Sequence, residues 1–331
     1  MHPPRLWSLP KPNLAARLLA PLGWIYGAVT AARMSGQGAR LSVPVICVGN
    51  FTLGGAGKTP TCLMLAQMLI DAGHRPVFVS RGYGGALSSK APVLVSLERH
   101  TSAEVGDEPL LLARLAPCFI CTDRLAAAQA AIAAAATVII LDDGLQNPKL
   151  AKTFSLAVVD AQAGFGNGLC FPAGPLRAPL KAQLRHVDAV IFIGKDVAEN
   201  DRLLARLRPD LHSFSGALVP DAAIAAGLSG QRVFAFAGIG RPEKFFQTLR
   251  ETGADVVATQ SFPDHREFSA KDMESLAKIS KSRGVIPVTT QKDAMRLPPR
   301  LRANVVALPV TLHLRQAAQL LALVQTKIQA L

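Results

Sequence analysis

A glycine-rich loop at residues 49–59 constrains the fold of this chain more than any other segment. Its core, Gly-Gly-Ala-Gly-Lys-Thr at residues 54–59, follows an apolar, β-branched run and precedes an apolar segment that Pro60 opens. Glycines let successive backbone N–H groups point at phosphates, and the Lys-Thr pair supplies an ammonium for the β- and γ-phosphates and a hydroxyl for Mg²⁺. A strand, this loop and a helix in succession predict a P-loop nucleotide-binding core.

The loop departs at one position from the usual G-x-x-x-x-G-K-[ST] pattern, because Thr52 stands where the first glycine is expected. What remains is the G-G-x-G-K-T variant seen in several P-loop ATPases and kinases. We expect Lys58 to reach the β- and γ-phosphates of ATP and the Thr59 hydroxyl to face Mg²⁺. The predicted nucleotide-binding residues are Thr52, Leu53, Gly54, Gly55, Ala56, Gly57, Lys58 and Thr59.

Apolar, strand-like runs alternate with helical segments along most of the chain. This alternation predicts a doubly wound, mostly parallel α/β sheet of the P-loop NTPase type. The composition agrees, because aromatics are only 5% and charged residues 18% of the chain, which suits a core of Ala, Val, Leu and Ile between a sheet and its helices. After the loop and its helix, strands are expected at residues 76–79, 92–95, 137–141, 155–159 and 189–193.

A second alternating run begins near residue 233 and predicts a smaller α/β domain. Its strands are expected at residues 233–237, 255–259 and 285–289, and its helices at 242–252 and 270–283. We therefore divide the chain into an N-terminal helix and link (1–41), a P-loop core (42–220) and a smaller C-terminal domain that closes over the site (221–331).

The N-terminal segment at residues 13–34 is apolar and carries Arg17 and Arg33 near its ends. Only about 15 uncharged residues lie between these arginines, whereas a helix that spans a bilayer needs about 20. Export is disfavoured, because a nucleotide-binding loop follows closely and nucleoside triphosphates are cytosolic. Two interpretations stay open: a helix that lies in the membrane interface with its arginines at lipid phosphates, or a helix that packs on the protein's own sheet.

The charge balance favours an anionic partner. Thirty-six Lys and Arg against 23 Asp and Glu give a net charge of +13, which suits a phosphorylated ligand, an anionic lipid surface or a nucleic acid. Nucleic acid is not supported by any basic motif interleaved with aromatics. Cys118 and Cys121 have redox or zinc spacing, but without a second ligand pair we interpret them as packing residues.

Two acidic pairs are candidates for phosphoryl-transfer chemistry. Asp142 and Asp143 end a predicted buried strand at the same sheet edge as the loop, where one carboxylate could support Mg²⁺ directly or through water. An ordinary Asp-Gly turn is the alternative. Asp107 and Glu108 precede an apolar helix, and the residues alone leave helix capping and proton acceptance from an attacking hydroxyl equally open.

Two segments of the second domain are weaker signals. His265 follows a predicted strand, and a single loop histidine is usually just exposed. Residues 289–294, Thr-Thr-Gln-Lys-Asp-Ala, also follow a strand and approach the guanine-reading N-K-x-D pattern. Lys292 and Asp293 are adjacent, however, so the spacing of that pattern is not met and a GTPase loses its base-specificity signal.

Seven motifs in order resemble those of the tetraacyldisaccharide 4'-kinase family, the lipid A 4'-kinases of the Gram-negative inner membrane. The resemblance covers nearly the whole chain. It implies ATP-dependent phosphorylation of the 4'-hydroxyl of a tetraacylated glucosamine disaccharide 1-phosphate, giving lipid IVA at the cytoplasmic face of that membrane. The motifs are VGNFTLGGAGKTP (48–60), SRGYGG (80–85), VGDEP (105–109), LDDGLQ (141–146), FGNGLCFPAGPLR (165–177), FPDH (262–265) and TQKDA (290–294).

The resemblance also implies roles for individual residues. Lys58 and Thr59 would hold ATP and Mg²⁺, Asp142 or Asp143 would support the metal, and Glu108 would join its shell. Asp107 would be the catalytic base, paired with His265 across the cleft between the domains. Arg81 and Arg177 would contact phosphates of the substrate or the nucleotide.

The chain departs from the family's motifs at Asn147, Ala178 and Gln291, and no role is carried onto Asn147. The main rival function is a P-loop ATPase or GTPase switch of the partitioning or metallochaperone kind. Such switches often carry a second lysine near the start of the loop, where this chain has Leu53. A nucleotide-binding membrane adaptor without enzymatic activity is a second rival. We expect neither a nucleic-acid partner nor an obligate protein partner.

Overall fold

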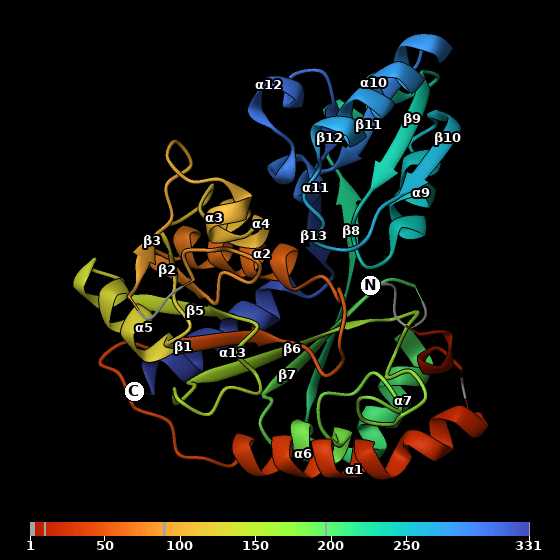
Figure 1. Ribbon diagram of the computed structural model, residues 1–331. Helices are drawn as coiled ribbons and strands as arrows, with labels where there is room; N and C mark the ends of the chain where they lie inside the picture. The colour runs from red at the N-terminus through yellow and green to blue at the C-terminus, as the bar shows by residue number, and fades with distance from the viewer. Residues whose placement is uncertain (1–3, 10, 89–90, 196, 331) are drawn as a thin grey trace.

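A large, mostly parallel sheet and a smaller parallel sheet organise the chain, as the computed structural model shows (Figure 1). The structure describes residues 4–9, 11–88, 91–195 and 197–330. Residues 1–3 and 10 of the predicted N-terminal part therefore lie outside the described residues.

The large sheet has nine strands within the described residues. All neighbouring pairs are parallel except β3 with β4 and β13 with β8, at the two edges. In spatial order the strands are β13 (Val310–Leu314), β8 (His212–Pro220), β7 (Ala189–Ile193), β6 (Phe154–Asp160), β1 (Val45–Gly49), β5 (Val138–Asp142), β2 (Pro76–Ser80), β4 (Cys118–Ile120) and β3 (Val93–Leu94).

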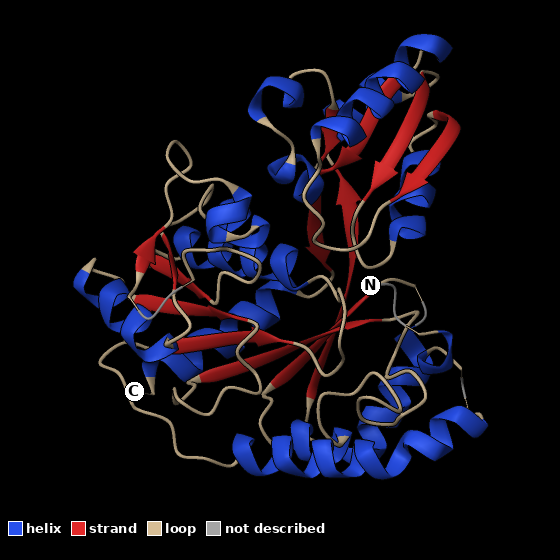
Figure 2. Ribbon diagram, viewed as in Figure 1, coloured by secondary structure: helices blue, strands red, loops and turns tan. Residues whose placement is uncertain are grey.

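Helices cover both faces of this sheet (Figure 2), so the predicted doubly wound α/β fold is confirmed. The strands are buried on both sides: in β1, Ile46 and Val48 face one core while Val45 and Cys47 face the other. The first core packs against α2 (Lys58–Asp71), α3 (Ser102–Val105), α4 (Asp107–Leu112) and α13 (Ala317–Gln329). The second packs against α5 (Arg124–Ala133), α6 (Leu180–Leu184), α7 (Val197–Leu207) and the end of α1 (Leu14–Met34).

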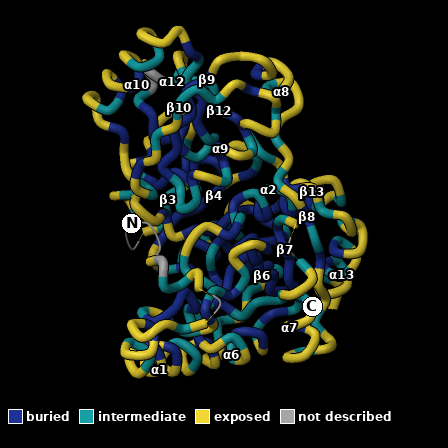
Figure 3. Tube along the Cα trace, turned by 90° about the vertical axis from the view of Figure 1, so that its right-hand side faces the viewer, coloured by how far each residue is buried: buried dark blue, intermediate teal, exposed yellow. Residues whose placement is uncertain are grey.

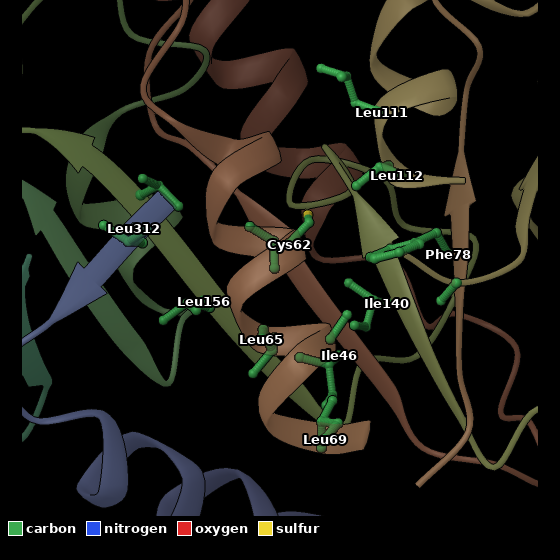
Figure 4. Close-up of a cluster of buried hydrophobic side chains, with 14 of the residues drawn as sticks. Ile46, Cys62, Leu65, Leu69, Phe78, Leu111, Leu112, Ile140, Leu156 and Leu312 are labelled. Carbon is green, nitrogen blue, oxygen red and sulfur yellow. The ribbon is translucent and has the colours of Figure 1, made fainter. Parts of the chain in front are cut away.

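Figure 4 shows part of the first core, in which Leu65 of α2 lies among Ile46, Ile140 and Leu156 from three neighbouring strands. Aliphatic side chains at these positions hold α2 flat on the sheet. The phosphate-binding loop that precedes α2 is thereby fixed at the carboxyl edge of β1.

The smaller sheet is parallel, in the order β10 (Asp255–Ser261), β9 (Arg232–Ala237), β11 (Ile286–Thr290) and β12 (Val306–Leu308). The predicted helix at 270–283 forms as α10 (Ala270–Arg283), with Ser269 and Asp272 as a capping box. The other short helices of the chain are η1 (Arg5–Trp7), α8 (Ala222–Leu228), α9 (Pro242–Glu251), α11 (Gln291–Arg296) and α12 (Pro299–Arg302).

The last segment of the chain does not stay with the smaller sheet. We expected residues 221–331 to form one domain, but β13 pairs with β8 at the edge of the large sheet, and α13 packs on the large sheet's first core. The cause is apolar burial: Leu312, Leu320 and Val324 are each at most 2% exposed there. The smaller domain is therefore an insertion whose two connections to the large sheet follow β8 and precede β13 (Figure 1).

Helix α1 packs against the rest of the protein along one side only. Ala16, Gly23, Gly27 and Met34 are buried against the protein, so one side does pack on the fold. The other side is exposed along its length at the foot of the molecule (Figure 3). Its large exposed side chains are Leu14, Leu18, Leu22, Trp24, Ile25, Tyr26 and Val29.

Candidate active site

The glycine-rich loop joins β1 to α2 as predicted. Helix α2 begins at Lys58, two residues before the predicted start at Pro60, so Lys58 and Thr59 lie in its first turn. Gly57 is the N-cap residue, with φ of +94°, a conformation that side-chain-bearing residues rarely adopt. The Asn50 side chain donates to the Gly54 carbonyl at 3.2 Å and stabilises the turn of the loop. The helix N-terminus and the loop amides together form a site for anions.

The loop opens into a cleft of about 2300 Å³ between the two sheets. Elements from both domains and from α1 line this cleft. Among its lining residues are those of the loop from Leu53 to Thr59, together with Arg81, Glu108, Asp142, Asp143, Arg177, His265 and Lys292. All the predicted site residues except Thr52 and the buried Asp107 thus line one cavity.

Asp142 is a buried carboxylate beside the loop, because β5 pairs with β1 and Val48 is its direct partner. The side chain is only 2% exposed and accepts a hydrogen bond from Ser80 Oγ at 3.0 Å. Burial, with the charges of Glu108 and Asp143 nearby, raises the pKa of Asp142 to about 7. A divalent cation beside this carboxylate would oppose these effects, because it favours the ionised form and so lowers the pKa of Asp142.

Asp143 differs from its neighbour in having cationic partners. Arg177 donates two hydrogen bonds to its carboxylate, at 2.9 and 3.1 Å, and Lys58 Nζ lies 3.8 Å from Oδ1. Although burial raises the pKa of Asp143, Lys58 and Arg177 outweigh it and lower this pKa to about 2. Asp143 is therefore ionised and orients Lys58 at the loop.

Arg177 has a structural task that the sequence did not suggest. Besides the paired bonds to Asp143, its Nε donates to the Thr52 carbonyl at 3.1 Å and its Nη1 approaches Gln146 Oε1 at 3.2 Å. These bonds connect the start of the loop to the end of β5. Arg81, by contrast, is exposed and lines the cleft.

Asp107 and His265 meet across the two domains. Asp107 is the first residue of α4 and 3% exposed, and its Oδ1 lies 3.5 Å from His265 Nδ1. The backbone N–H of Glu108 donates to the same oxygen at 2.8 Å, and Arg296 Nε lies 3.1 Å from Oδ2. Burial raises the pKa of Asp107, but Lys292, His265 and Arg296 together lower it to about 2.

Lys292 is a member of this cluster to which the sequence assigned no role. Its Nζ lies 3.0 Å from Glu108 Oε1, 3.3 Å from His265 Nε2 and 4.0 Å from Asp107 Oδ2. Burial lowers the pKa of Lys292, but the surrounding carboxylates outweigh this and raise it above its ordinary value. The available signal was its position two residues after the end of β11. Functional side chains commonly lie at this carboxyl edge of a parallel sheet.

A second contact between the domains was also missed. Asp160, at the end of β6, is paired with Arg241 Nη1 at 2.8 Å and Lys244 Nζ at 3.0 Å, both from the start of α9. Burial raises the pKa of Asp160, but Lys244 and Arg241 outweigh it and lower this pKa. The two clusters stand on either side of the loop and tie the smaller domain to the large sheet.

The arrangement of donors does not form an all-protein metal cage. Within the described part of the chain, no group of three or more His, Cys, Asp and Glu side chains could hold a metal ion. The Thr59 hydroxyl and the buried Asp142 carboxylate instead lie beside the phosphate-binding loop. This donor set suits Mg²⁺, which typically takes one or two protein ligands with phosphates and water.

Comparison with known proteins identifies the family. The model of the family described as tetraacyldisaccharide-1-P 4'-kinase matches residues 15–329. The chain belongs to this family. It is 54% identical to the tetraacyldisaccharide 4'-kinase of Methylobacterium nodulans, over 93% of this chain and 90% of that protein. The corresponding enzyme of Bradyrhizobium diazoefficiens is 50% identical, over 90% of this chain and 87% of that protein.

A solved structure agrees with the assignment to the tetraacyldisaccharide-1-P 4'-kinases. LpxK from Aquifex aeolicus, crystallised in complex with ATP, matches with a TM-score of 0.73 and 27% identity, over 95% of this chain and all of that one. The predicted family, the α/β fold and the phosphotransferase class are thus confirmed. The partitioning or metallochaperone switch is not favoured.

Proposed function

We propose that this member of the tetraacyldisaccharide-1-P 4'-kinases transfers the γ-phosphoryl group of ATP to the 4'-hydroxyl of a tetraacylated glucosamine disaccharide 1-phosphate, giving lipid IVA. The observation that carries the proposal is one cleft lined both by the phosphate-binding loop and by His265, whose Nδ1 lies 3.5 Å from the buried Asp107 carboxylate. Phosphoryl transfer requires that the phosphates of ATP and the base that accepts the hydroxyl proton lie close to the same acceptor group.

The loop residues 52–59 would bind the phosphates of ATP through backbone N–H groups, with Lys58 beside them. Asp143 holds Lys58 in place through the 3.8 Å ion pair. The Thr59 hydroxyl and Asp142 would hold Mg²⁺, with Glu108 in reach of the same region. When bound, Mg²⁺ neutralises charge on the transferring phosphoryl group.

Asp107 would accept the proton of the attacking 4'-hydroxyl. A base must be ionised to do so, and the low pKa of Asp107 keeps it ionised throughout the physiological range. Its Oδ2 atom lies 3.1 Å from Arg296 Nε and 4.0 Å from Lys292 Nζ, and these two cations keep the carboxylate charged. His265 holds the other oxygen. Arg81, exposed in the cleft, would contact a substrate phosphate.

We further propose that α1 lies on the anionic cytoplasmic face of the inner membrane. Within the described residues, α1 alone is long and apolar enough to be considered as a membrane span, and 22% of its apolar window is buried. Leu14, Leu18 and Leu22 project from it at four-residue spacing and form one apolar stripe. Tyr26, Thr30 and Arg33 of the same helix line the cleft. A lipid substrate could therefore reach the loop from the membrane surface.

The activity is tested with purified protein, γ-labelled ATP, Mg²⁺ and the disaccharide 1-phosphate. We expect label in a bis-phosphorylated lipid, and none when lipid IVA, already phosphorylated at the 4' position, replaces the acceptor. Lys58→Met is the control for the nucleotide site. Intact ATP binding without any transfer to lipid would contradict the kinase function and would favour the adaptor.

The membrane contact is tested by flotation with vesicles rich in anionic lipid. Leu18→Glu with Leu22→Glu should reduce binding, because charges on the stripe oppose its burial in the interface. Ile70→Glu is the matched control, since Ile70 is an exposed apolar residue at the end of α2. Equal binding of the double variant and the control would refute the contact.

A further inference from the structure

Lys292 occupies a fixed place between the two domains. It lies in the first turn of α11, whose N-cap Thr290 accepts a hydrogen bond from the Asp293 N–H at 3.0 Å. Asp293 is fully buried and accepts from the Gly238 N–H, also at 3.0 Å. The backbone on both sides of Lys292 is therefore anchored within the smaller domain, while its ammonium reaches Glu108 on α4.

The contact between Lys292 and His265 determines which imidazole nitrogen carries a proton. The carboxylates around Lys292 raise its pKa, so its side chain is an ammonium, which can only donate. A hydrogen bond from Nζ to His265 Nε2, 3.3 Å away, requires that Nε2 be unprotonated. If Nε2 carried a proton instead, it would need an acceptor. Asp264 Oδ1 is 3.8 Å from Nε2, which is beyond hydrogen-bond range.

The other ring nitrogen then carries the hydrogen. His265 Nδ1 lies 3.5 Å from Asp107 Oδ1, so an N–H at this position points at the carboxylate. The ring packs against Tyr83 in an edge-to-face arrangement, with 5.4 Å between the ring centroids. The opposite tautomer would aim a lone pair of Nδ1 at the Asp107 carboxylate and an N–H at the ammonium.

We propose that Lys292 is a positioning residue that fixes His265 in the Nδ1–H tautomer and so aims its N–H at Asp107. Glu108 holds the ammonium in place through the 3.0 Å contact. The expected effect on catalysis rests on the proposed function, in which Asp107 is the base. The assignment of the tautomer is independent of that function. The adjacent Lys292 and Asp293 of the TQKDA segment therefore have different roles. Asp293 anchors the first turn of α11, and Lys292 contacts Glu108 and His265.

The tautomer is measured by two-bond ¹H–¹⁵N correlation spectra of the imidazole rings in ¹⁵N-labelled full-length protein. His265→Asn identifies the signals of His265 by their loss. We expect the wild-type spectrum at pH 8 to show the ring hydrogen of His265 on Nδ1. Lys292→Met should shift this pattern towards Nε2–H or an average, and Lys292→Arg, which also only donates, should keep it. Lys278→Met, at an exposed position of α10, is the control.

The spectra test the tautomer of His265, and the kinetics test its effect on catalysis. Protonation of His265 at Nε2 in wild type would overturn the inference, and this measurement stands even if Lys292→Met does not fold. An unchanged tautomer in folded Lys292→Met would overturn it as well. We expect Lys292→Met to lower kcat by roughly ten- to a hundredfold with little change of KM for ATP, and Lys292→Arg to recover most of it. Absence of kinase activity in wild type with His265 in the Nδ1–H form would reject the proposed function alone.

Discussion

His265 Nδ1 lies 3.5 Å from Asp107 Oδ1, although the histidine follows β10 of the smaller sheet and the aspartate begins α4 on the large one. The pair exists only while the two domains are together. Arg296 lies 3.1 Å from the other Asp107 oxygen and comes from the smaller domain as well. In a cleft assembled in this way, closure of the domains around the substrate also brings His265 and Arg296 to Asp107.

Asp107→Asn should lower kcat by about 10²- to 10⁴-fold, because the amide cannot accept the proton of the attacking hydroxyl. The KM for ATP should change little, since the nucleotide site lies on the other side of the cleft. Steady-state kinetics with the lipid acceptor measure both. The matched control is Asp255→Asn, an exposed aspartate on β10. Circular dichroism must show a folded variant, because the substitution removes one of the carboxylates that face Arg296 and Lys292. A kcat close to wild type would remove Asp107 from the mechanism.

Arg177→Lys should raise the KM for ATP roughly tenfold and leave the KM for the lipid nearly unchanged. A lysine cannot reproduce the paired hydrogen bonds to Asp143 together with the bond to the Thr52 carbonyl. Loss of one hydrogen bond to a charged group costs about 1.5–3 kcal/mol. Kinetics with each substrate varied in turn check this. The opposite result, in which only the KM for the lipid rises, would instead support the contact to a substrate phosphate that the family resemblance implies.

Gly57→Ala should weaken ATP binding and lower the thermal stability. The φ of +94° disfavours any residue with a Cβ by about 1–2 kcal/mol, and the added Cβ would lie 2.6 Å from Ile193 Cδ1. Combining it with Ile193→Val removes the clashing atom but not the backbone strain, so recovery should be partial. Calorimetric ATP titration and scanning calorimetry measure both effects. Gly227→Ala in α8 is the control, since a Cβ there meets nothing within 4 Å. Full recovery in the double variant would assign the whole effect to the clash.

The parts of the site that the sequence predicted are those encoded in contiguous residues. The loop, Lys58 and Thr59 follow from one segment, and Asp142 follows from the rule that neighbouring parallel strands bring their carboxyl ends together. Strand β7 and helix α10 have the bounds expected from their apolar patterns and caps. For the loop, β7 and α10 the physical cause acts within a few residues along the chain, whereas Asp142 is placed by the pairing of β5 with β1.

The parts that the sequence missed depend on pairing between distant segments. Lys292 and Asp160 acquire their partners only when the smaller domain packs against the large sheet. The return of β13 to the large sheet is set by its antiparallel pairing with β8, which no local pattern indicates. The family resemblance assigned Arg177 to a phosphate, whereas its bonds to Asp143 and Thr52 depend on contacts between distant segments.

Asp142→Asn should stabilise the protein in the absence of Mg²⁺ and ATP, and increasingly so as the pH rises from about 4 to 7. The pKa of Asp142 is about 7 in the folded chain against an ordinary 3.8. Between these values the unfolded chain is ionised while the folded chain keeps its proton, so wild-type stability falls as the pH rises, and it levels off above 7. The two pKa values differ by an amount that corresponds to about 4 kcal/mol at most. Calorimetric Tm values of variant and wild type across this range, with Asp255→Asn as control, measure the difference. Adding Mg²⁺ and ATP should reverse the order, because the ligands stabilise wild type more strongly than a variant that lacks the carboxylate. A Tm difference independent of pH would show that Asp142 is ionised in the folded protein even without a cation.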